Sequence, residues 1–488
     1  MGMVFQKMTK TTLSGEWTPL ACLLDAGDEP ANSGLYNPDL SPVPKAKRDW
    51  TWVNMATVWM GMVHNVVAYE TAAGLMALGM SAWQALSATF LANFVIFIAL
   101  WFNAKAGTRY GVPFCVLIRS SFGPRGAQIP VILRGFIGIF WFAVMAYAGS
   151  QALDAMIGTL CPAWKTLHQS FLGMSIQGWG SVLLFWLLHA WIVGHGIRRI
   201  KNFELIAGPL VICVAMAGVV WGVHVSHGLG SIFKQPSHLS GTSGLMVYAG
   251  AVTGLIGGWS CFAVNIPDLS RFVRSDRDQM IGQLIGLPVT AVVFAAMSVI
   301  VTSATIIAYG KPIWNPVDLL IAIGNPWILL FGGATVVIAT LSVNVAANIL
   351  PACYDLANLF PRRLSFARAS IVVLIIGLCF APWLWYRNAA SIFHILTAIG
   401  GLLGPVTGIM LADYFIVRRK HYDVADLFRY DGMYAAYKGW NIAGLTAFVL
   451  GGAAALSGLF VPFLEPAYMF SWFIGLGVSA AVYCLASR

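Results

Sequence analysis

Apolar residues dominate the chain after Trp50 and fall into twelve runs separated by short polar connections. An α-helix needs about 20 such residues to cross the hydrocarbon core of a bilayer. The pattern predicts an all-α polytopic membrane protein with 12 transmembrane helices. Their approximate limits are 52–78, 84–104, 127–155, 178–196, 203–225, 245–268, 282–308, 327–358, 368–386, 390–416, 440–461 and 466–486.

The sixth run contains a cluster of glycines, because Gly254, Gly257 and Gly258 fall within five positions and Trp259 follows at once. Glycine weakens a helix by about 1 kcal/mol relative to alanine. Unpaired backbone at membrane depth persists only where protein or a water-filled cavity surrounds it. We therefore expect this helix to be broken at the midplane, as transporter helices are beside a binding site.

The first run has a comparable irregular centre, from Gly61 to Asn65. If the first ten spans form two halves of five, spans 1 and 6 correspond and run in opposite directions, which is the pattern of an inverted repeat. The predicted organisation is an N-terminal arm at 1–50, one repeat at 51–225, the second at 244–417 and two further helices at 438–488.

Composition and charge agree with this class. The chain is 58% hydrophobic and 10% charged, which excludes a soluble protein. Of its 29 Lys and Arg residues, 25 fall on the side of the N-terminal arm and the C-terminus. By the positive-inside rule both termini are cytoplasmic. This distribution explains the net charge of +10 without a nucleic-acid partner, and the polar first fifty residues lack a signal peptide.

Aromatic and amide side chains are the candidates for a binding site. Trp141 and Met145 lie four apart and share a helical face, while Trp259 lies deep in span 6. Such tryptophans either pack in the core or stack on a flat ligand. Asn344 and Asn348 also share a face, and amides there either join helices or meet a polar ligand.

Ionisable residues inside spans are functional candidates by default. Glu70 is the leading candidate for a protonatable group lining the outer vestibule, with a solvated carboxylate near the outer surface as the alternative. Asp355 and Asp413, near the cytoplasmic ends, are expected to be solvated or to pair with Arg362, Arg418 or Arg419. The remaining candidates are His64, His189 and His394. The eight cysteines are scattered, so neither a metal site nor a disulfide framework is expected, and enzymatic motifs are absent.

Five blocks, in this order, resemble the nucleobase–cation symport family, and within it the bacterial allantoin permeases. They are WMGMVHN at 59–65, FWFAVMAYAGS at 140–150, GGWSCFAVNIPDLSRF at 257–272, SVNVAANI at 342–349 and GPVTGIMLADYF at 404–415. The resemblance covers nearly the whole chain from about residue 36 and implies a LeuT-type fold of five plus five helices. It also implies an inner-membrane secondary transporter without a cofactor.

The resemblance also implies roles for individual residues. Trp141 and Trp259 match the tryptophans that sandwich the substrate, with Gly258 beside them. Asn348 and Asn65 match amides that reach the substrate, and Leu396 matches a leucine that closes over it. For a coupling cation, the matching positions are Gly61, His64, Ala339 and Ser342.

Two residues depart from the family pattern. Met145 stands where hydantoin and allantoin carriers have a glutamine, so recognition of a polar ring edge should be weaker or the substrate different. Val343 stands where the sodium-coupled member has a threonine ligand. Proton coupling, or very weak coupling to any ion, is then favoured over sodium coupling, with Glu70 or His64 as the candidate proton site.

The sequence therefore predicts import of a small planar nitrogen heterocycle, with allantoin or a hydantoin as the lead and a purine or pyrimidine base as the alternative. A membrane sensor with the same pocket is a hypothesis from another class. A channel is disfavoured because the spans hold too few polar residues to line a continuous pore. The substrate, the coupling ion and the oligomeric state stay open.

Overall fold

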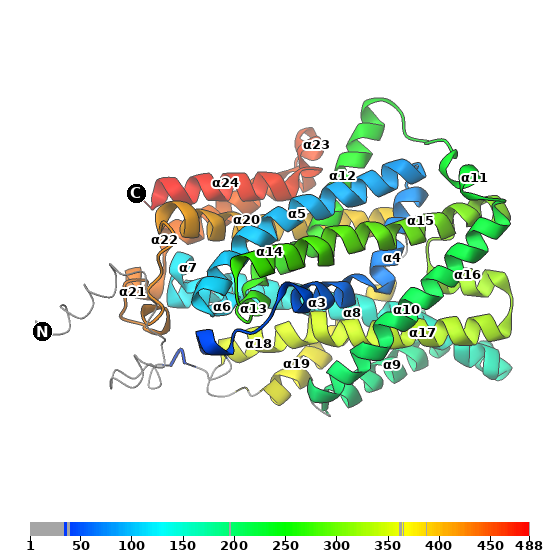
Figure 1. The fold of residues 1–488 in the computed structure, drawn as a ribbon, viewed down its shortest axis with the longest axis horizontal. Helices are drawn as coiled ribbons and strands as arrows, with labels where there is room; N and C mark the ends of the chain where they lie inside the picture. Colours follow the sequence, from blue (N-terminus) through cyan, green and yellow to red (C-terminus); the bar gives the residue numbers. More distant parts are fainter. Residues whose placement is uncertain are drawn as a thin grey trace, which may run out of the picture.

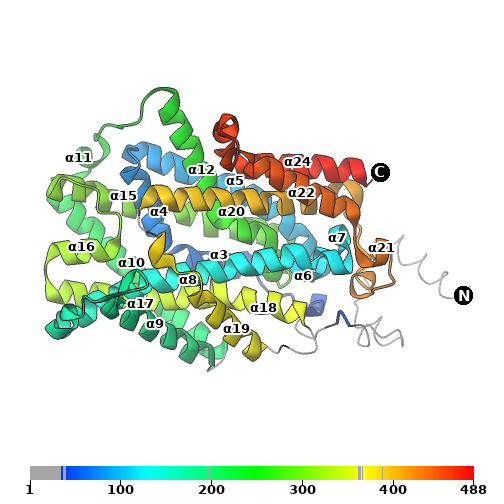
Figure 2. The same cartoon turned by 180° about the vertical axis from the view of Figure 1, so that it is seen from behind.

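The computed structural model describes residues 34–36, 40–194, 197–360, 364, 366–386 and 388–487, and most of these residues are helical. Most of the predicted N-terminal arm lies outside the described residues. The long helices lie side by side, roughly along one axis (Figures 1 and 2). Local signals set some of their ends: α5 begins with a capping box between Ser81 and Gln84 and ends at Gly111, whose φ is 73°.

The first half of the chain alternates long helices with short connecting elements. Its helices are α3 (Trp52–Val63), α4 (Val66–Ala77), α5 (Ala82–Tyr110), α6 (Phe114–Leu117), α7 (Arg119–Gly126), α8 (Gln128–Leu160), α9 (Ile176–Gly194), α10 (Ile197–Val225) and α11 (Leu229–Phe233). Between α8 and α9, the strands β1 (Ser170–Phe171) and β2 (Met174–Ser175) form an antiparallel hairpin.

The second half repeats this alternation, and π-helical turns interrupt several of its long helices. Its helices are α12 (Gly241–Asn265), α13 (Pro267–Ser270), α14 (Asp276–Leu284), α15 (Thr290–Tyr309), α16 (Pro316–Ile323), α17 (Pro326–Asn344), α18 (Leu350–Leu359), α19 (Phe366–Leu378), α20 (Ala389–Ala412), α21 (Ala436–Gly439), α22 (Ile442–Leu456), α23 (Glu465–Tyr468) and α24 (Ser471–Ala486). The π-helical turns are η5 (Ile285–Val289), η6 (Val345–Ile349) and η8 (Asp413–Val417).

Eight helices of the described part of the chain are long and apolar enough to cross a membrane. The other four expected spans, at 52–78, 203–225, 368–386 and 466–486, correspond to shorter apolar helices or to a pair bent by 90°. The structure is therefore that of a multi-pass helical protein, and the count of twelve spans stays a prediction.

The first span is interrupted near its centre. The helix α3 ends at Val63 and α4 begins at Val66. Between them His64 and Asn65 have non-helical backbone angles. This interruption falls within the segment Gly61–Asn65, where the sequence predicts one.

The sixth span differs from the expectation, because α12 runs without interruption through Gly254, Gly257 and Gly258. The prediction of a break at these glycines is wrong in this structure. A Cβ at Gly257 would overlap the carbonyl oxygen of Leu396, and one at Gly254 would lie 2.9 Å from the Phe393 ring. The glycines therefore allow α12 to pack closely against α20, which is the use that membrane proteins commonly make of small residues.

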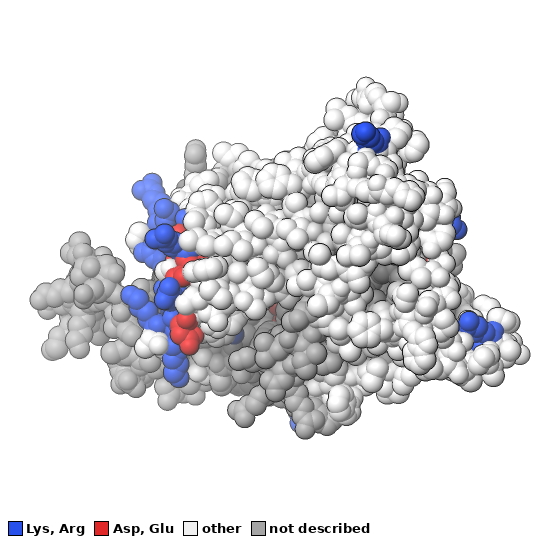
Figure 3. Space-filling model, turned by 45° about the vertical axis from the view of Figure 1, so that its right-hand side comes forward, with Lys and Arg blue, Asp and Glu red and all other residues white. Residues whose placement is uncertain are grey.

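Lys and Arg side chains gather at the end of the molecule where α24 ends, and few appear on the rest of the displayed face (Figure 3). The long, largely uncharged flank between the two ends carries exposed apolar side chains such as Phe90, Phe94 and Val220. An apolar flank with charges at the ends is what a lipid bilayer solvates.

Candidate functional site

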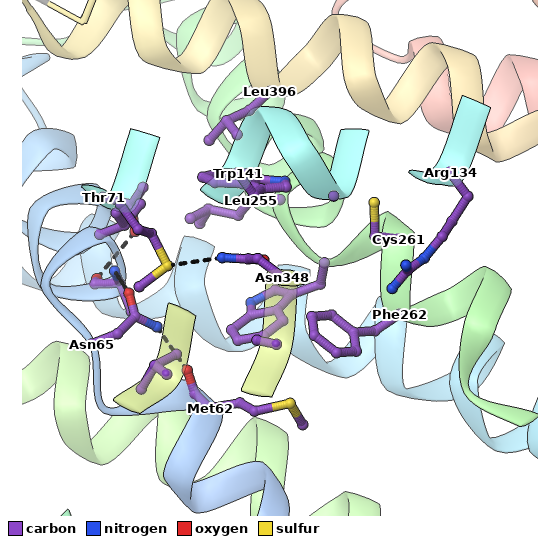
Figure 4. A pocket seen from close by; sticks show the side chains of 18 residues that line it. Met62, Asn65, Thr71, Arg134, Trp141, Leu255, Cys261, Phe262, Asn348 and Leu396 are labelled. Carbon is purple, nitrogen blue, oxygen red and sulfur yellow. Dashed lines mark hydrogen bonds between the residues drawn. The ribbon is translucent and has the colours of Figure 1, made fainter. Parts of the chain in front are cut away.

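A cavity of about 90 Å³ lies inside the helix bundle, between the interrupted first span and helices α8, α12, α17 and α20 (Figure 4). Its lining is mostly apolar with a few amide and hydroxyl groups, as ligand pockets generally are. The lining residues are Met62, Asn65, Val67, Ala68, Thr71, Arg134, Gly138, Trp141, Met145, Leu255, Gly258, Trp259, Cys261, Phe262, Val343, Ala347, Asn348 and Leu396.

The structure brings together all seven residues that the sequence assigns to the substrate site. They come from four separate helices and the break in the first span, and they are Asn65, Trp141, Met145, Gly258, Trp259, Asn348 and Leu396. Since α12 is continuous, Gly258 reaches the cavity as part of a helix rather than at a break. A Cβ at Gly258 would lie 3.9 Å from a methyl of Leu396, so its absence leaves space open to the cavity.

Aromatic rings support the wall formed by Trp259. The Trp259 ring meets the fully buried Trp59 edge to face at 5.8 Å between centroids, and it lies 5.8 Å from Phe262. Across the cavity, Trp141 meets Phe140 at 5.7 Å, also edge to face. Both tryptophans are therefore held by neighbouring rings, which favours fixed planes for stacking.

The polar end of the cavity is built by Asn348 on the π-helical turn η6. Its Nδ2 donates to Oδ1 of Asn344 across 2.8 Å. The same nitrogen donates to Sδ of Met145 across 3.1 Å (Figure 4). Asn344 in turn donates to the carbonyl oxygen of Phe142 at 3.1 Å. The expected shared face of Asn344 and Asn348 is confirmed, and the two amides act as one hydrogen-bonded unit.

Asn65 lines the cavity, but its amide is already engaged by nearby backbone. Its Oδ1 accepts from the amide of Ala68 at 2.9 Å and so caps α4, while Nδ2 donates to the carbonyl oxygen of Met62 at 2.7 Å. This capping explains why α4 begins directly after the interruption. Asn65 therefore mainly shapes the cavity, and its amide has little hydrogen-bonding capacity left for a ligand.

Of the five residues named for the cation, Val343 alone is among the residues that line the cavity. Ala339 and Ser342 are buried on the same helix, α17. Gly61 is exposed. His64 is buried at the interruption, where Nδ1 lies 2.6 Å from the carbonyl oxygen of Met60.

Glu70 does not line the cavity. It is 2% exposed, and one carboxylate oxygen accepts a hydrogen bond from the hydroxyl of Tyr386. Its Oε1 has no hydrogen-bond partner among the described residues. The expectation of a solvated carboxylate near the outer surface is therefore wrong, because Glu70 is buried and bonded to Tyr386, three residues before α20 begins.

Arg134 also lines the cavity, and the site interpretation of the sequence did not include it. Figure 4 shows it at the end opposite Asn65 and Thr71. Its Nη1 forms a buried ion pair with Oδ2 of Asp355 at 2.9 Å. Asp355 is therefore buried and paired with an arginine of α8 rather than solvated, and the expected partner Arg362 lies outside the described residues. Asp413 pairs with Arg418 at 3.4 Å, as expected.

Other lining residues missed by the sequence are apolar or small. Met62 and Thr71 lie on α3 and α4, on either side of the interruption, and Leu255 and Phe262 lie three to four residues from Gly258 and Trp259 on α12. The three- and four-residue spacing from Leu255 to Gly258 and Trp259 was the available signal. Periodicity alone does not tell whether such a face meets a cavity or another helix.

A multi-pass helix bundle with an interrupted first span and an aromatic-lined central cavity defines a protein of the secondary-transporter class. Residues 42–475 match the family model described as a permease for cytosine/purines, uracil, thiamine and allantoin, and the chain belongs to this family. It has the LeuT-type fold, and its relatives include allantoin, purine-uracil and hydantoin permeases.

Individual relatives cover nearly the same length. The allantoin permease of Bacillus subtilis is 41% identical over 457 residues, covering 93% of each chain. The purine-uracil permease of Arabidopsis thaliana is 34% identical over 421 residues, covering 86% of this chain and 70% of the relative.

Among solved structures, the transporter Mhp1 is similar in two conformations, each 26% identical. The inward-facing form has a TM-score of 0.79 and covers 94% of each chain. The closed form with bromovinylhydantoin has a TM-score of 0.75 and covers 93% of this chain and 95% of the other.

Proposed function

We propose that this chain imports allantoin or a related hydantoin across the bacterial inner membrane as a cation symporter. The carrying observation is the cavity in which Trp141, Trp259 and Asn348 meet. Two ring faces and one amide suit a small planar molecule with polar edges. The proposal is also supported by the allantoin permease relative and by the hydantoin derivative bound to Mhp1.

The mechanism that we propose is alternating access. The substrate stacks between Trp141 and Trp259, Asn348 bonds its amide edge, and Leu396 closes over it. The bundle of spans 1, 2, 6 and 7 then rocks against spans 3, 4, 8 and 9. In this proposal the first ten of twelve spans form two inverted repeats, at 51–225 and 244–417, and both termini are cytoplasmic.

The coupling cation in this proposal is a proton rather than sodium. Val343 stands where the sodium-coupled member of the family has a threonine ligand. A sodium ion bound here would therefore lack one oxygen among about five donors. The buried carboxylate of Glu70 is our candidate for the proton site, since a buried acid between two moving helices changes its surroundings when the helices move.

A purine or pyrimidine base is the second candidate substrate. The 34% identity to the purine-uracil permease favours it, and Met145 adds to it because a thioether suits a less polar ring edge than an amide does.

Uptake by the purified protein in liposomes tests the proposal. Radiolabelled allantoin should accumulate above its external concentration when a proton gradient is imposed, and unlabelled hydantoin should compete with it. Protein-free liposomes and liposomes with collapsed gradients are the controls. Binding without accumulation under any ion gradient would show a sensor instead of a transporter.

A further inference from the structure

A buried chain of hydrogen bonds runs from α9 to the cavity through His189, Asn344 and Asn348. His189 is fully buried and does not line the cavity. Its Nε2 lies 3.1 Å from Nδ2 of Asn344, and Oδ1 of Asn344 accepts from Asn348 at 2.8 Å. Because His189 does not reach the cavity itself, it can affect the site only through Asn344 and Asn348.

The direction of this chain is fixed by two backbone carbonyl groups, which can only accept hydrogen bonds. The carbonyl oxygen of Phe142 lies 3.1 Å from Asn344, so the amide nitrogen of Asn344 must point there. The carbonyl oxygen of Phe185 lies 3.0 Å from Nδ1 of His189, so Nδ1 carries the hydrogen. Nε2 of the neutral ring is then an acceptor that faces the amide nitrogen of Asn344.

The same reasoning fixes the second amide. Because the nitrogen of Asn344 points away, its Oδ1 faces Asn348 and requires a donor there. The nitrogen of Asn348 therefore faces Asn344, and its second hydrogen points to Sδ of Met145 at 3.1 Å. Among the described residues no partner is found for the Asn348 Oδ1, which belongs to a residue that lines the cavity.

We propose that His189 and Asn344 are positioning residues that hold Asn348 with its carbonyl oxygen towards the cavity, so that the substrate must present an N–H donor there. A reversed Asn348 amide would set its oxygen against Oδ1 of Asn344 and leave buried polar atoms unpaired, which is costly. The inference rests on the proposed function and narrows it to ligands with a donor on the edge that meets Asn348.

Methylated ligands test the polarity directly. Hydantoin, 1-methylhydantoin and 3-methylhydantoin are compared as competitors of radiolabelled allantoin binding to the reconstituted protein. We expect at least one methylated form to lose about tenfold in affinity or more, because its N–H is removed where Asn348 accepts. Equal competition by all three would overturn the inference. No binding of allantoin, hydantoin, uracil or adenine to the wild-type protein would instead overturn the proposed function.

Matched variants at His189 test the relay. His189→Phe keeps a ring of similar size against Phe142 and Phe185 but removes the acceptor, whereas His189→Gln keeps an acceptor for Asn344. We expect about a tenfold weaker allantoin affinity for His189→Phe and most of the affinity recovered in His189→Gln.

A double-mutant cycle separates positioning from general packing. In an Asn348→Ala background, His189→Phe should have little further effect on binding, because its influence passes through the missing amide. A full additional loss in that background would overturn the relay. If His189→Phe does not fold, the comparison of His189→Gln with Asn348→Ala and the methylated ligands still decides.

Discussion

The side-chain amide of Asn348 donates a hydrogen bond to the Sδ atom of Met145 across 3.1 Å. The two residues come from η6 and α8, and both line the cavity. A thioether is a weak acceptor. The second amide hydrogen of Asn348 therefore has a poor partner, and position 145 decides how polar this end of the cavity is.

Met145→Gln should strengthen binding of allantoin and hydantoin. A glutamine at this position places a strong donor and acceptor beside Asn348, which suits a ureido edge. We expect an increase in affinity of about fivefold to tenfold, on the scale of one additional hydrogen bond. Competition binding with both compounds measures it, with Met145→Leu as the control that changes shape but adds no polar group. Unchanged competition by Met145→Gln would mean that position 145 does not meet the substrate.

Trp259→Ala should abolish uptake while the protein still folds and inserts. The variant removes one stacking plane, while Trp59 and Phe262 keep their own ring contact at 5.4 Å between centroids. Trp327→Ala is the matched control, since Trp327 is 79% exposed and does not line the cavity. Initial rates of labelled allantoin uptake, normalised to inserted protein, check the prediction. Normal uptake by Trp259→Ala would remove the stacking arrangement.

Uptake should respond more to a proton gradient than to a sodium gradient. Val343 offers no oxygen to a cation, and Val343→Thr should introduce a measurable stimulation by sodium because it adds a hydroxyl on α17. Val343→Ala serves as the control without a hydroxyl. Strict dependence of the wild-type protein on sodium would show that the interpretation of this position is wrong.

Variants at Glu70 and Tyr386 should distinguish a role in proton coupling from a role in protein stability. Tyr386→Phe leaves the buried carboxylate without its hydrogen-bond donor, and we expect a loss of about 1–3 kcal/mol in stability. Glu70→Gln keeps a partner for the tyrosine, so it should stay folded but lose stimulation by a proton gradient. Thermal unfolding and gradient-driven uptake are measured side by side. Glu70→Gln with full proton stimulation would exclude Glu70 as the proton site.

Removing one partner of the Arg134–Asp355 ion pair should lower the stability of the protein more than replacing both partners by apolar residues. Arg134→Met leaves a buried carboxylate uncompensated, and we expect a loss of about 3–5 kcal/mol. The double variant Arg134→Met/Asp355→Leu should recover a large part of that loss, because neither charge of the pair is then buried without its partner. Thermal unfolding in detergent compares the two. Equal destabilisation of the single and double variants would contradict this account.

The sequence by itself determined the membrane class and the interruption near Asn65. Apolar runs, charge asymmetry and capping residues are local properties, and each is readable without knowing which helices touch. The matched family blocks also pointed to the seven residues that now surround one cavity.

Tertiary structure decided what these segments meet. The glycines of α12 could have broken a helix or allowed close packing, and only the position of Leu396 against Gly257 shows the second. Likewise, Glu70 pairs with Tyr386 and Asp355 pairs with Arg134, and each partner is more than two hundred residues away along the chain. Such pairings depend on how helices pack in three dimensions, and a local hydrophobic pattern carries no information about them.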